Sequence, residues 1–303
     1  MIDQAEKLRN MARIFNDGPK SAPRKRAGLA GGARVITVSS GKGGVGKTNF
    51  AVNLAVQLSK RGVRAVVIDA DFGLANVEVL LGVAPGRSLS DVLTGGLTMR
   101  QVLTDGPCGV KFISGGSGLG QLSDISDRQL EYIMENLSFL DTVADIVIVD
   151  TGAGISKNVV NFIEASGEAV LITTPEPTSI ADAYSVLRTV ANRAGAPPSF
   201  KIVVNRAENR AEGAEVYNKL NAVSRRFLNL PLESLGVILA DQNVVRAIRS
   251  QQPFSVCFPN TPAAKCLEQI VSRLTEAGPS GRGSSKPDEG VRGFVKRLSL
   301  VFK

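Results

Sequence analysis

A glycine-rich loop between a strand and a helix is the feature that most limits what this chain can fold into. The stretch VITVSSGKGGVGKT, residues 35–48, is a β-branched run that ends in the pattern G-x-x-x-x-G-K-[ST], and TNFAVNLAVQLSKRG follows with helical spacing. In such a loop backbone N–H groups converge on phosphate oxygens, and the helix N-terminus adds partial positive charge. The candidate phosphate contacts are Gly41, Gly43, Gly44, Val45, Gly46, Lys47, Thr48 and Asn49.

Short β-branched runs alternate with helical patterns along most of the remaining chain. The expected strands lie within ARVITVSS, RAVVIDAD, VKFISG, ADIVIVD, EAVLITTPE, FKIVVN and LESLGVILA. Continuous apolar strands joined by crossover helices are typical of a buried, mostly parallel sheet. We therefore predict one doubly wound α/β domain over residues 33–277, with helices on both faces of the sheet.

Carboxylates follow two of the predicted strands. Asp69 and Asp71 come just after VVI, and Asp150 ends the run IVIV. Because ligands of open α/β sheets bind at the carboxyl ends of the strands, we expect these acids to lie beside the phosphate loop. Oxygen ligands suit Mg²⁺, so the Thr48 hydroxyl and these three carboxylates are the candidates for a magnesium site.

Three motifs together resemble those of the MinD/ParA ATPases. They are GKGGVGKT, with its second lysine Lys42, then DADFGLAN and DTGAG, which are similar to the phosphate loop and the two switch segments of that family. The resemblance covers residues 33–277 and implies ATP or ADP with Mg²⁺ as ligands. It also implies a homodimer that forms on ATP, in which Lys42 reaches the phosphates bound by the partner subunit.

The same resemblance assigns further roles within the site. Lys47 serves the nucleotide of its own chain, and Asp71 positions the attacking water, so that Lys42, Lys47 and Asp71 are the candidate catalytic residues. Asp69 and Asp150 are implied to hold waters of the Mg²⁺ ion, which makes them the candidate metal residues together with Thr48. Asn205 in KIVVNR is implied to contact adenine, together with Arg206 and with a loop that includes Asp241 and Gln242. The glycine cluster GGSGLG, residues 115–120, is interpreted as a loop and not as a dinucleotide fingerprint, because no strand ending in an acid follows it.

Composition excludes several other classes of protein. The chain has no His, which removes imidazole-dependent triads and most zinc catalysis. Its three cysteines are scattered without a CxxC motif, so a metal-cluster carrier of the same superfamily is not supported. The absence of a signal peptide and of a long apolar run predicts a cytoplasmic protein.

The positive charge of the chain is confined to its two ends. Residues 1–30 carry seven Lys/Arg against three Asp/Glu and residues 278–303 carry six against two, whereas the 247 residues between them carry 23 of each sign. A neutral core disfavours a ParA-like DNA segregation factor, which we retain as an alternative. The basic ends are instead expected to meet partners or membrane surfaces.

The C-terminal segment GVRGFVKRLSLVFK is amphipathic when it is drawn as a helix. Basic residues lie opposite an apolar face of Val291, Phe294, Val295, Leu298, Val301 and Phe302. After an apolar-free linker, residues 278–290, a helix over residues 291–303 is expected to lie in an anionic membrane interface and to bind more strongly in a dimer. This tail resembles the membrane-targeting helix of MinD, and a final helix packed on the core is the alternative.

The N-terminal segment carries a second family signature. DQAEKLR, residues 3–9, resembles the DQAxxLR motif of the FlhG branch of the family, also called YlxH or FleN. The resemblance implies an activator helix over residues 1–16, a linker over 17–32, and stimulation of the signal-recognition-particle-type GTPase FlhF. The implied partner-binding residues are Asp3, Gln4, Ala5, Leu8 and Arg9.

The whole resemblance implies a regulator of flagellum number and placement. Such a protein cycles between a cytosolic monomer and a peripherally membrane-associated ATP dimer, and it contacts flagellar switch-ring proteins or a flagellar transcription regulator. A division-site MinD is the further alternative, which the DQAEKLR segment disfavours.

Overall fold

The computed structural model describes residues 32–71, 76–93, 96–116, 132, 136–193, 197–276 and 290–302. The predicted activator helix over residues 1–16, with its partner-binding residues, lies outside the described residues, as does nearly all of the linker expected over 278–290. Of the predicted first switch, DADFGLAN, the structure describes residues 69–71 and Asn76.

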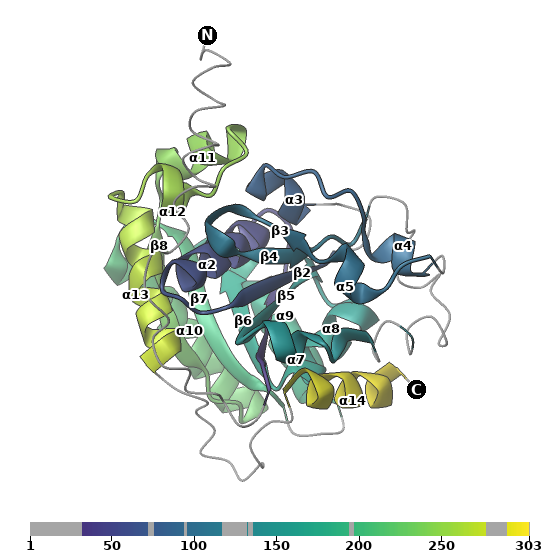
Figure 1. Ribbon diagram of the computed structural model, residues 1–303. Coiled ribbons are helices and arrows are strands. Elements are labelled where there is room, and N and C mark those ends of the chain that lie inside the picture. Colours follow the sequence, from purple (N-terminus) through teal and green to yellow (C-terminus); the bar gives the residue numbers. More distant parts are fainter. Residues whose placement is uncertain are drawn as a thin grey trace.

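An eight-stranded sheet forms the centre of the molecule, with the strand order β3-β4-β2-β5-β1-β6-β7-β8 (Figure 1). All neighbouring strands are parallel except β3 and β4. The prediction of a mostly parallel, doubly wound sheet is therefore confirmed. The strands are β1 (Arg34–Ser40), β2 (Ala65–Ala70), β3 (Thr104–Asp105), β4 (Lys111–Ile113), β5 (Ile146–Ala153), β6 (Glu168–Thr173), β7 (Ser199–Ala207) and β8 (Glu233–Leu239).

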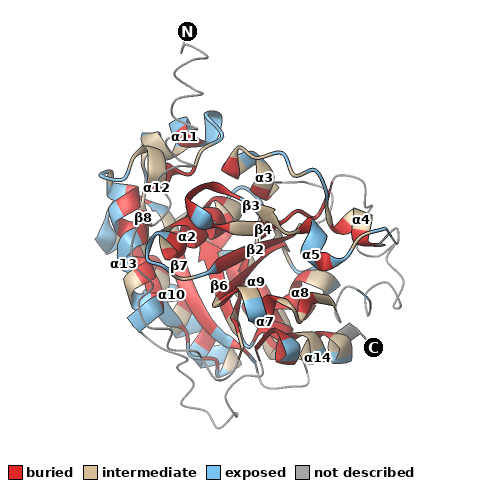
Figure 2. Cartoon of the chain, in the orientation of Figure 1, coloured by how far each residue is buried: buried red, intermediate tan, exposed pale blue. Residues whose placement is uncertain are grey.

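The central strands are apolar throughout because both faces of the sheet are covered. In β5, Ile146 and Ile148 enter the core on one face, and Val147 and Val149 enter the core on the other. Figure 2 shows the strands as an almost continuously buried layer. Strands buried on both sides lack polar alternation, which is why this pattern predicted a parallel sheet.

Helices cover both faces of this sheet. One core joins the sheet to α2, α3, α12 and α13, and two further cores join it to α4, α5, α7, α8, α9, α10 and α14. The helices are α2 (Lys47–Lys60), α3 (Asn76–Leu81), α4 (Leu89–Leu93), α5 (Met99–Val102), η1 (Pro107–Gly109), α7 (Leu140–Val143), α8 (Lys157–Ser166), α9 (Pro177–Ala191), α10 (Arg210–Leu228), α11 (Gln242–Arg249), α12 (Phe254–Cys257), α13 (Pro262–Glu276) and α14 (Gly290–Phe302).

The position of α14 differs from the expectation of a helix that stands apart from the core. Val291, Phe294 and Leu298 are each only 1% exposed and belong to the core that α7 and α8 share. The Phe294 ring stacks on Phe162 of α8 with centroids 6.4 Å apart, and the Arg297 guanidinium donates to the Ala165 carbonyl at 2.7 Å. The alternative, a final helix packed on the core, describes this structure, because the apolar face finds enough apolar surface on α8.

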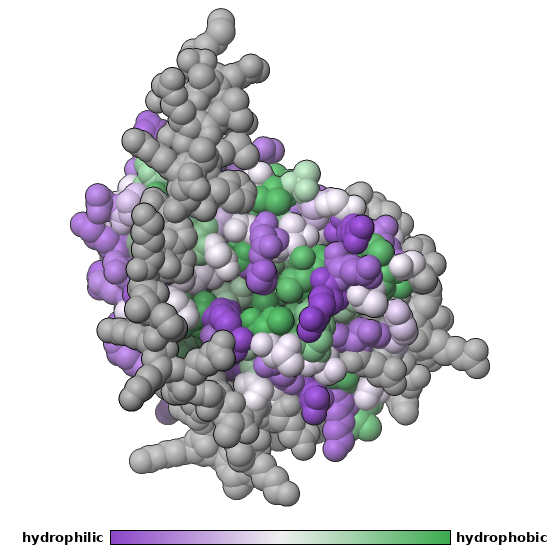
Figure 3. Space-filling view, viewed as in Figure 1, coloured by the Kyte–Doolittle hydropathy of each residue, from purple (hydrophilic) through white to green (hydrophobic). Residues whose placement is uncertain are grey.

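The surface is otherwise that of a typical α/β domain. On the face seen in Figure 3, hydrophilic residues surround a smaller hydrophobic area near the middle of the molecule. Within the described residues, none of the helices combines the length and the apolar character that crossing a bilayer requires.

Candidate nucleotide site

The phosphate loop joins β1 to α2 at the carboxyl edge of the sheet. Gly46 precedes α2 with φ 95°, and no side chain caps the helix N-terminus. Gly43 and Gly44 have no atom within 4 Å of the position where a Cβ would stand, so the space above them is open. Backbone N–H groups at an uncapped helix N-terminus below an open loop suit an anionic phosphate chain.

Two other glycines of the loop are required by close packing. A Cβ on Gly41 would lie 2.2 Å from the backbone carbon of Asp182 in α9, and one on Gly46 would lie 2.5 Å from Asn205 Nδ2. Asn205 donates from that nitrogen to the Val45 carbonyl at 2.7 Å. The loop is therefore held from two sides while its middle stays open.

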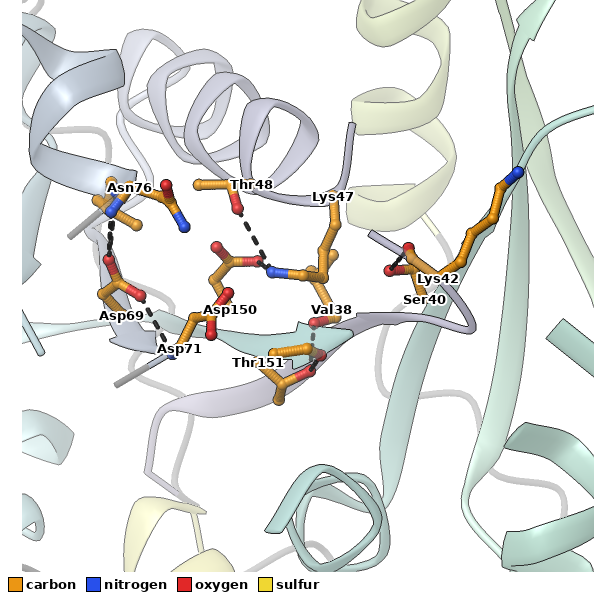
Figure 4. A network of polar contacts seen from close by, with 12 residues as sticks. Val38, Ser40, Lys42, Lys47, Thr48, Asp69, Asp71, Asn76, Asp150 and Thr151 are labelled. Atoms are coloured by element: carbon orange, nitrogen blue, oxygen red, sulfur yellow. Dashed lines mark hydrogen bonds and ion pairs between the residues drawn. The ribbon is translucent and has the colours of Figure 1, made fainter. Parts of the chain in front are cut away.

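Lys47, Thr48 and Asp150 meet below the loop (Figure 4). Lys47 Nζ lies 2.7 Å from Asp150 Oδ1 and 3.3 Å from the Thr48 hydroxyl. The Lys47 side chain is 7% exposed and that of Asp150 is fully buried. Burial raises the pKa of the Asp150 carboxyl above its ordinary value, and the Lys47 ammonium opposes that shift. β5 continues to Ala153, so Asp150 lies within the strand and not at its end.

Asp69 organises the start of α3. Its Oδ1 accepts from the Asp71 N–H at 3.2 Å, and its Oδ2 accepts from the N–H groups of Asn76 and Val77 at 3.1 and 3.2 Å. Burial, and the nearby Asp150 carboxylate, raise the pKa of Asp69 to about 7. Asp69 pairs with Asp150 in the register of β2 and β5, which places the two predicted metal residues side by side.

Asp71 lies at the same edge, half-buried. A Cβ on Gly152 would stand 3.3 Å from Asp71 Oδ1, so a small residue at position 152 leaves room for Asp71 to lie there. Burial raises the pKa of Asp71, and the Lys47 ammonium opposes this. The structure thus brings together Lys47, Thr48 and all three predicted carboxylates.

The donor set fits a magnesium ion that is held largely through water and nucleotide oxygens. Asp150 Oδ2 is buried without a hydrogen-bond partner, beside a threonine hydroxyl. No group of three His, Cys, Asp or Glu side chains among the residues that the structure describes is placed to hold a metal alone. Mg²⁺ usually keeps several waters and takes few protein ligands, so this sparse set suits it.

Lys42 lies apart from this cluster. Its ammonium forms an ion pair with Glu176, the residue that precedes α9, and donates to the Thr178 hydroxyl at 3.0 Å. Figure 4 shows the Lys42 side chain pointing away from Lys47. The two lysines of the loop therefore serve different places, and Lys42 does not face the phosphate site of its own chain.

Two of the residues expected at the adenine ring, Asn205 and Asp241, make hydrogen bonds within the chain. Asn205 Oδ1 accepts from the Arg206 N–H at 2.9 Å, and Arg206 has a positive φ of 58°. Asp241 caps α11 through the Asn243 N–H and also accepts from the Ala263 N–H, at 2.9 and 3.3 Å. Arg206 and Gln242 are both exposed beside them. These four residues lie at the ends of β7 and β8, at the same edge as the loop.

Glu176 and Thr178 are site residues that sequence reasoning missed. The signal was present, because PEPTS follows the strand EAVLITT as Asp71 follows VVIDA. Both acids stand just beyond a parallel strand at the carboxyl edge. Without a motif to connect it to Lys42, a glutamate before a proline resembles an ordinary helix start.

Comparisons with known proteins place the chain in a family. Residues 36–254 match the model of the CobQ/CobB/MinD/ParA nucleotide binding domain. The antiactivator FleN of Pseudomonas aeruginosa is 38% identical over 274 residues, which cover 90% of this chain and 96% of FleN. The flagellum site-determining protein YlxH of Helicobacter pylori is 33% identical over 300 residues, or 98% of each chain.

A solved structure supports the fold independently. The septum site-determining protein MinD of Pyrococcus horikoshii, complexed with Mg-ADP, superimposes with a TM-score of 0.66 at 23% identity, covering 82% of this chain and 99% of that one. The motifs, the sheet order and these matches lead to one conclusion: the chain belongs to the CobQ/CobB/MinD/ParA family of nucleotide-binding proteins, in the group that contains FleN and YlxH.

Proposed function

We propose that this protein is an ATPase switch that dimerises on ATP, hydrolyses it in the dimer, and regulates the number or placement of flagella. One observation carries the ATPase part of the proposal. The buried Lys47–Asp150 pair lies beneath an open glycine loop, while the second lysine, Lys42, is held outside that site. The names of the relatives FleN and YlxH support the flagellar part.

The proposed chemistry assigns each side chain one task. Lys47 exchanges Asp150 for the phosphates of the bound nucleotide, and Thr48 with the freed Asp150 holds Mg²⁺ and its waters. When bound, Mg²⁺ neutralises charge on the phosphate oxygens. Asp71 orients the water that attacks the terminal phosphorus, and the raised pKa of its carboxyl suits a group that accepts a proton from that water.

Lys42 supplies the part of the site that one chain lacks. To reach a phosphate, the Lys42 ammonium must leave Glu176 and Thr178, and its side chain points away from Lys47 of the same chain. In a face-to-face dimer the lysine of each subunit would enter the site of the other. A cation supplied in trans is worth about 10³–10⁵ in the rate of phosphoryl transfer, so hydrolysis would depend on assembly.

The proposed adenine contacts lie at the ends of β7 and β8. Arg206 and Gln242 offer accessible polar groups there, while Asn205 and Asp241 fix the backbone that presents them. Asn205 would thus connect the base to the phosphate loop, because it bonds directly to Val45.

Membrane attachment would require α14 to leave the core. The apolar face that would enter a lipid interface is the face buried against α7 and α8, so docking and membrane binding exclude one another. α8 starts at Lys157, three residues after Gly154 of the second switch, and carries Phe162 and Ala165, which hold α14. A nucleotide-dependent shift of residues 150–156 would therefore reach α14 through one helix.

Measurements of dimerisation, nucleotide binding and liposome binding test this function. We expect the wild-type protein to be monomeric without nucleotide, to dimerise with ATP and Mg²⁺, and to float with anionic liposomes only as the dimer. Lys47→Ala should abolish nucleotide binding, with Lys60→Ala at the exposed end of α2 as the control. Deleting residues 291–303 should release the protein from liposomes while ATP binding persists. ATP-dependent binding to nonspecific DNA without binding to liposomes would support the ParA-like alternative instead.

The flagellar assignment has its own test. A peptide of residues 1–20 should stimulate GTP hydrolysis by the cognate FlhF, and Gln4→Ala in that peptide should remove the stimulation. A peptide with no effect would favour a division-site MinD. Contact with flagellar switch-ring proteins or a flagellar transcription regulator is the corresponding expectation for the ATP dimer.

A further inference from the structure

The start of the nucleotide-binding domain and the start of α14 meet at one carboxylate. The chain enters β1 through Gly32 and Ala33, and α14 starts at Gly290 and Val291. Asp141 of α7 lies between them: its Oδ1 accepts from the Ala33 N–H and from the Val291 N–H, both at 2.8 Å. These two donors are 258 residues apart in sequence and share a single oxygen atom.

The contact is specific to the start of α14. Asp141 Oδ2 also accepts from the Arg292 N–H, at 3.4 Å, so the carboxylate caps the first turn of the helix from outside. A negative charge at a helix N-terminus stabilises the helix through its dipole as well as through the hydrogen bonds. Of the three N–H groups that donate to Asp141, only that of Ala33 would therefore remain if α14 left.

Backbone packing reinforces the shared hydrogen bonds. Gly32 has φ 81°, and a Cβ there would lie 2.7 Å from Asp141 Oδ1 and 2.9 Å from the Gly290 Cα. The entering chain thus touches the first residue of α14 directly. Any side chain at position 32 would push against both the carboxylate and the start of the helix.

We propose that Asp141 is a latch that couples the chain entering β1 to the docking of α14. The latch consists of Asp141 with the Ala33 and Val291 amides. A change that pulls the N-terminal chain away from Asp141 loosens α14, and release of α14 loosens Ala33 in turn, because coupling between two sites is reciprocal. In its biological consequence this rests on the proposed function: it would link engagement of a partner by residues 1–16 to release of the membrane helix.

Amide hydrogen exchange of the full-length protein, without lipid, tests the coupling. Gly32→Ala should raise exchange of the α14 amides about tenfold relative to the β7 amides, as expected when hydrogen bonds to a charged group are lost. Gly62→Ala is the matched control, since Gly62 has the same φ of 81° and no atom within 4 Å of its Cβ position. Asp141→Ala should have the same effect as Gly32→Ala, and Phe294→Ala should raise exchange at Ala33.

The exchange pattern distinguishes a local latch from a general loss of stability. α14 exchange in Gly32→Ala that matches Gly62→Ala, or that rises only in proportion to β7, would overturn the proposal. Liposome flotation is measured separately on the same variants. Raised α14 exchange without any liposome binding would support the latch and reject the membrane role of α14. Liposome binding with unchanged α14 exchange would support the membrane role and reject the latch.

Discussion

The Lys47–Asp150 pair is the residue-scale feature that most needs a ligand to explain it. Among the ion pairs of the described residues, it alone has both side chains buried. A buried ion pair is costly to desolvate and is often no more stable than an apolar pair. Here one oxygen of Asp150 is also left without a hydrogen bond. These costs are understandable if the pair separates when phosphate and Mg²⁺ bind.

Titration of Asp69 provides a prediction at the same scale. Its pKa is raised from 3.8 to about 7 in the fold, so between these values the native state holds a proton that the unfolded chain has released. The free energy of unfolding of the nucleotide-free protein should therefore fall as pH rises through this window, by up to about 1.4 kcal/mol per pH unit. Urea denaturation from about pH 5 to about pH 7 measures this slope.

Asp69→Asn should reduce that slope, whatever it does to stability at any single pH. Asp105→Asn is the control, because the Asp105 side chain is 80% exposed on the edge strand β3. Equal slopes in Asp69→Asn and the wild-type protein would show that Asp69 does not carry the raised pKa.

At the scale of elements, different glycines of the phosphate loop are needed for stability and for nucleotide binding. Ala at position 46 would meet Asn205 Nδ2 at 2.5 Å with φ 95°, whereas Ala at position 43 would meet nothing within 4 Å. Gly46→Ala should thus lose about 1–3 kcal/mol of stability. The free energy of unfolding of Gly43→Ala should stay within about 0.5 kcal/mol of the wild-type value. This variant should bind ATP at least about tenfold more weakly, because the added Cβ occupies space that the phosphates need. Denaturation and calorimetric titration distinguish the two, and wild-type ATP affinity in Gly43→Ala would contradict the placement of the phosphates.

The helix α14 yields a second prediction at this scale. Phe294→Ala should reduce the free energy of unfolding by about 3–5 kcal/mol, because it removes a buried ring that stacks on Phe162. Leu300→Ala on the same helix should change it by less than about 0.5 kcal/mol, since Leu300 is 66% exposed. Thermal or urea unfolding checks both. Equal effects of the two substitutions would mean that α14 is not docked in solution.

These elements also show how far sequence reasoning reaches. The sheet and the loop with Lys47 were predictable because apolar strands and the glycine pattern are local signals. Asp69, Asp71 and Asp150 were predictable because they lie close to the carboxyl ends of two strands, although Asp69 and Asp150 are inside β2 and β5 and not beyond them. The docking of α14 could not be predicted, because the same amphipathic face suits both a lipid surface and the apolar side of α8. Glu176, Thr178 and Asp141 were missed because their partners lie more than 100 residues away along the chain.

At the scale of the whole molecule, the protein combines a charge-neutral nucleotide-binding domain with two basic ends. We expect the binding of these ends to a partner and to a membrane to depend on the nucleotide state of the domain. The nucleotide site lies at the carboxyl edge of the sheet, and Asp141 with the start of α14 lies near the amino end of β1. α8 connects the two regions. Under the proposed function, this arrangement would let one assembly event, dimerisation over the nucleotide, act on a distant helix.

The central claim, that Lys42 acts on the partner subunit's nucleotide, is tested most directly by mixing two inactive variants. Lys42→Ala keeps Asp71 and its own phosphate site, and Asp71→Ala keeps Lys42. Each alone should bind ATP without hydrolysing it. When they are mixed in equal amounts before ATP is added, the mixed dimer has one complete site, and hydrolysis should recover to about a quarter of the wild-type rate, since about half of the dimers are mixed. A mixture that stays as inactive as its components would contradict the claim and place the action of Lys42 within its own chain.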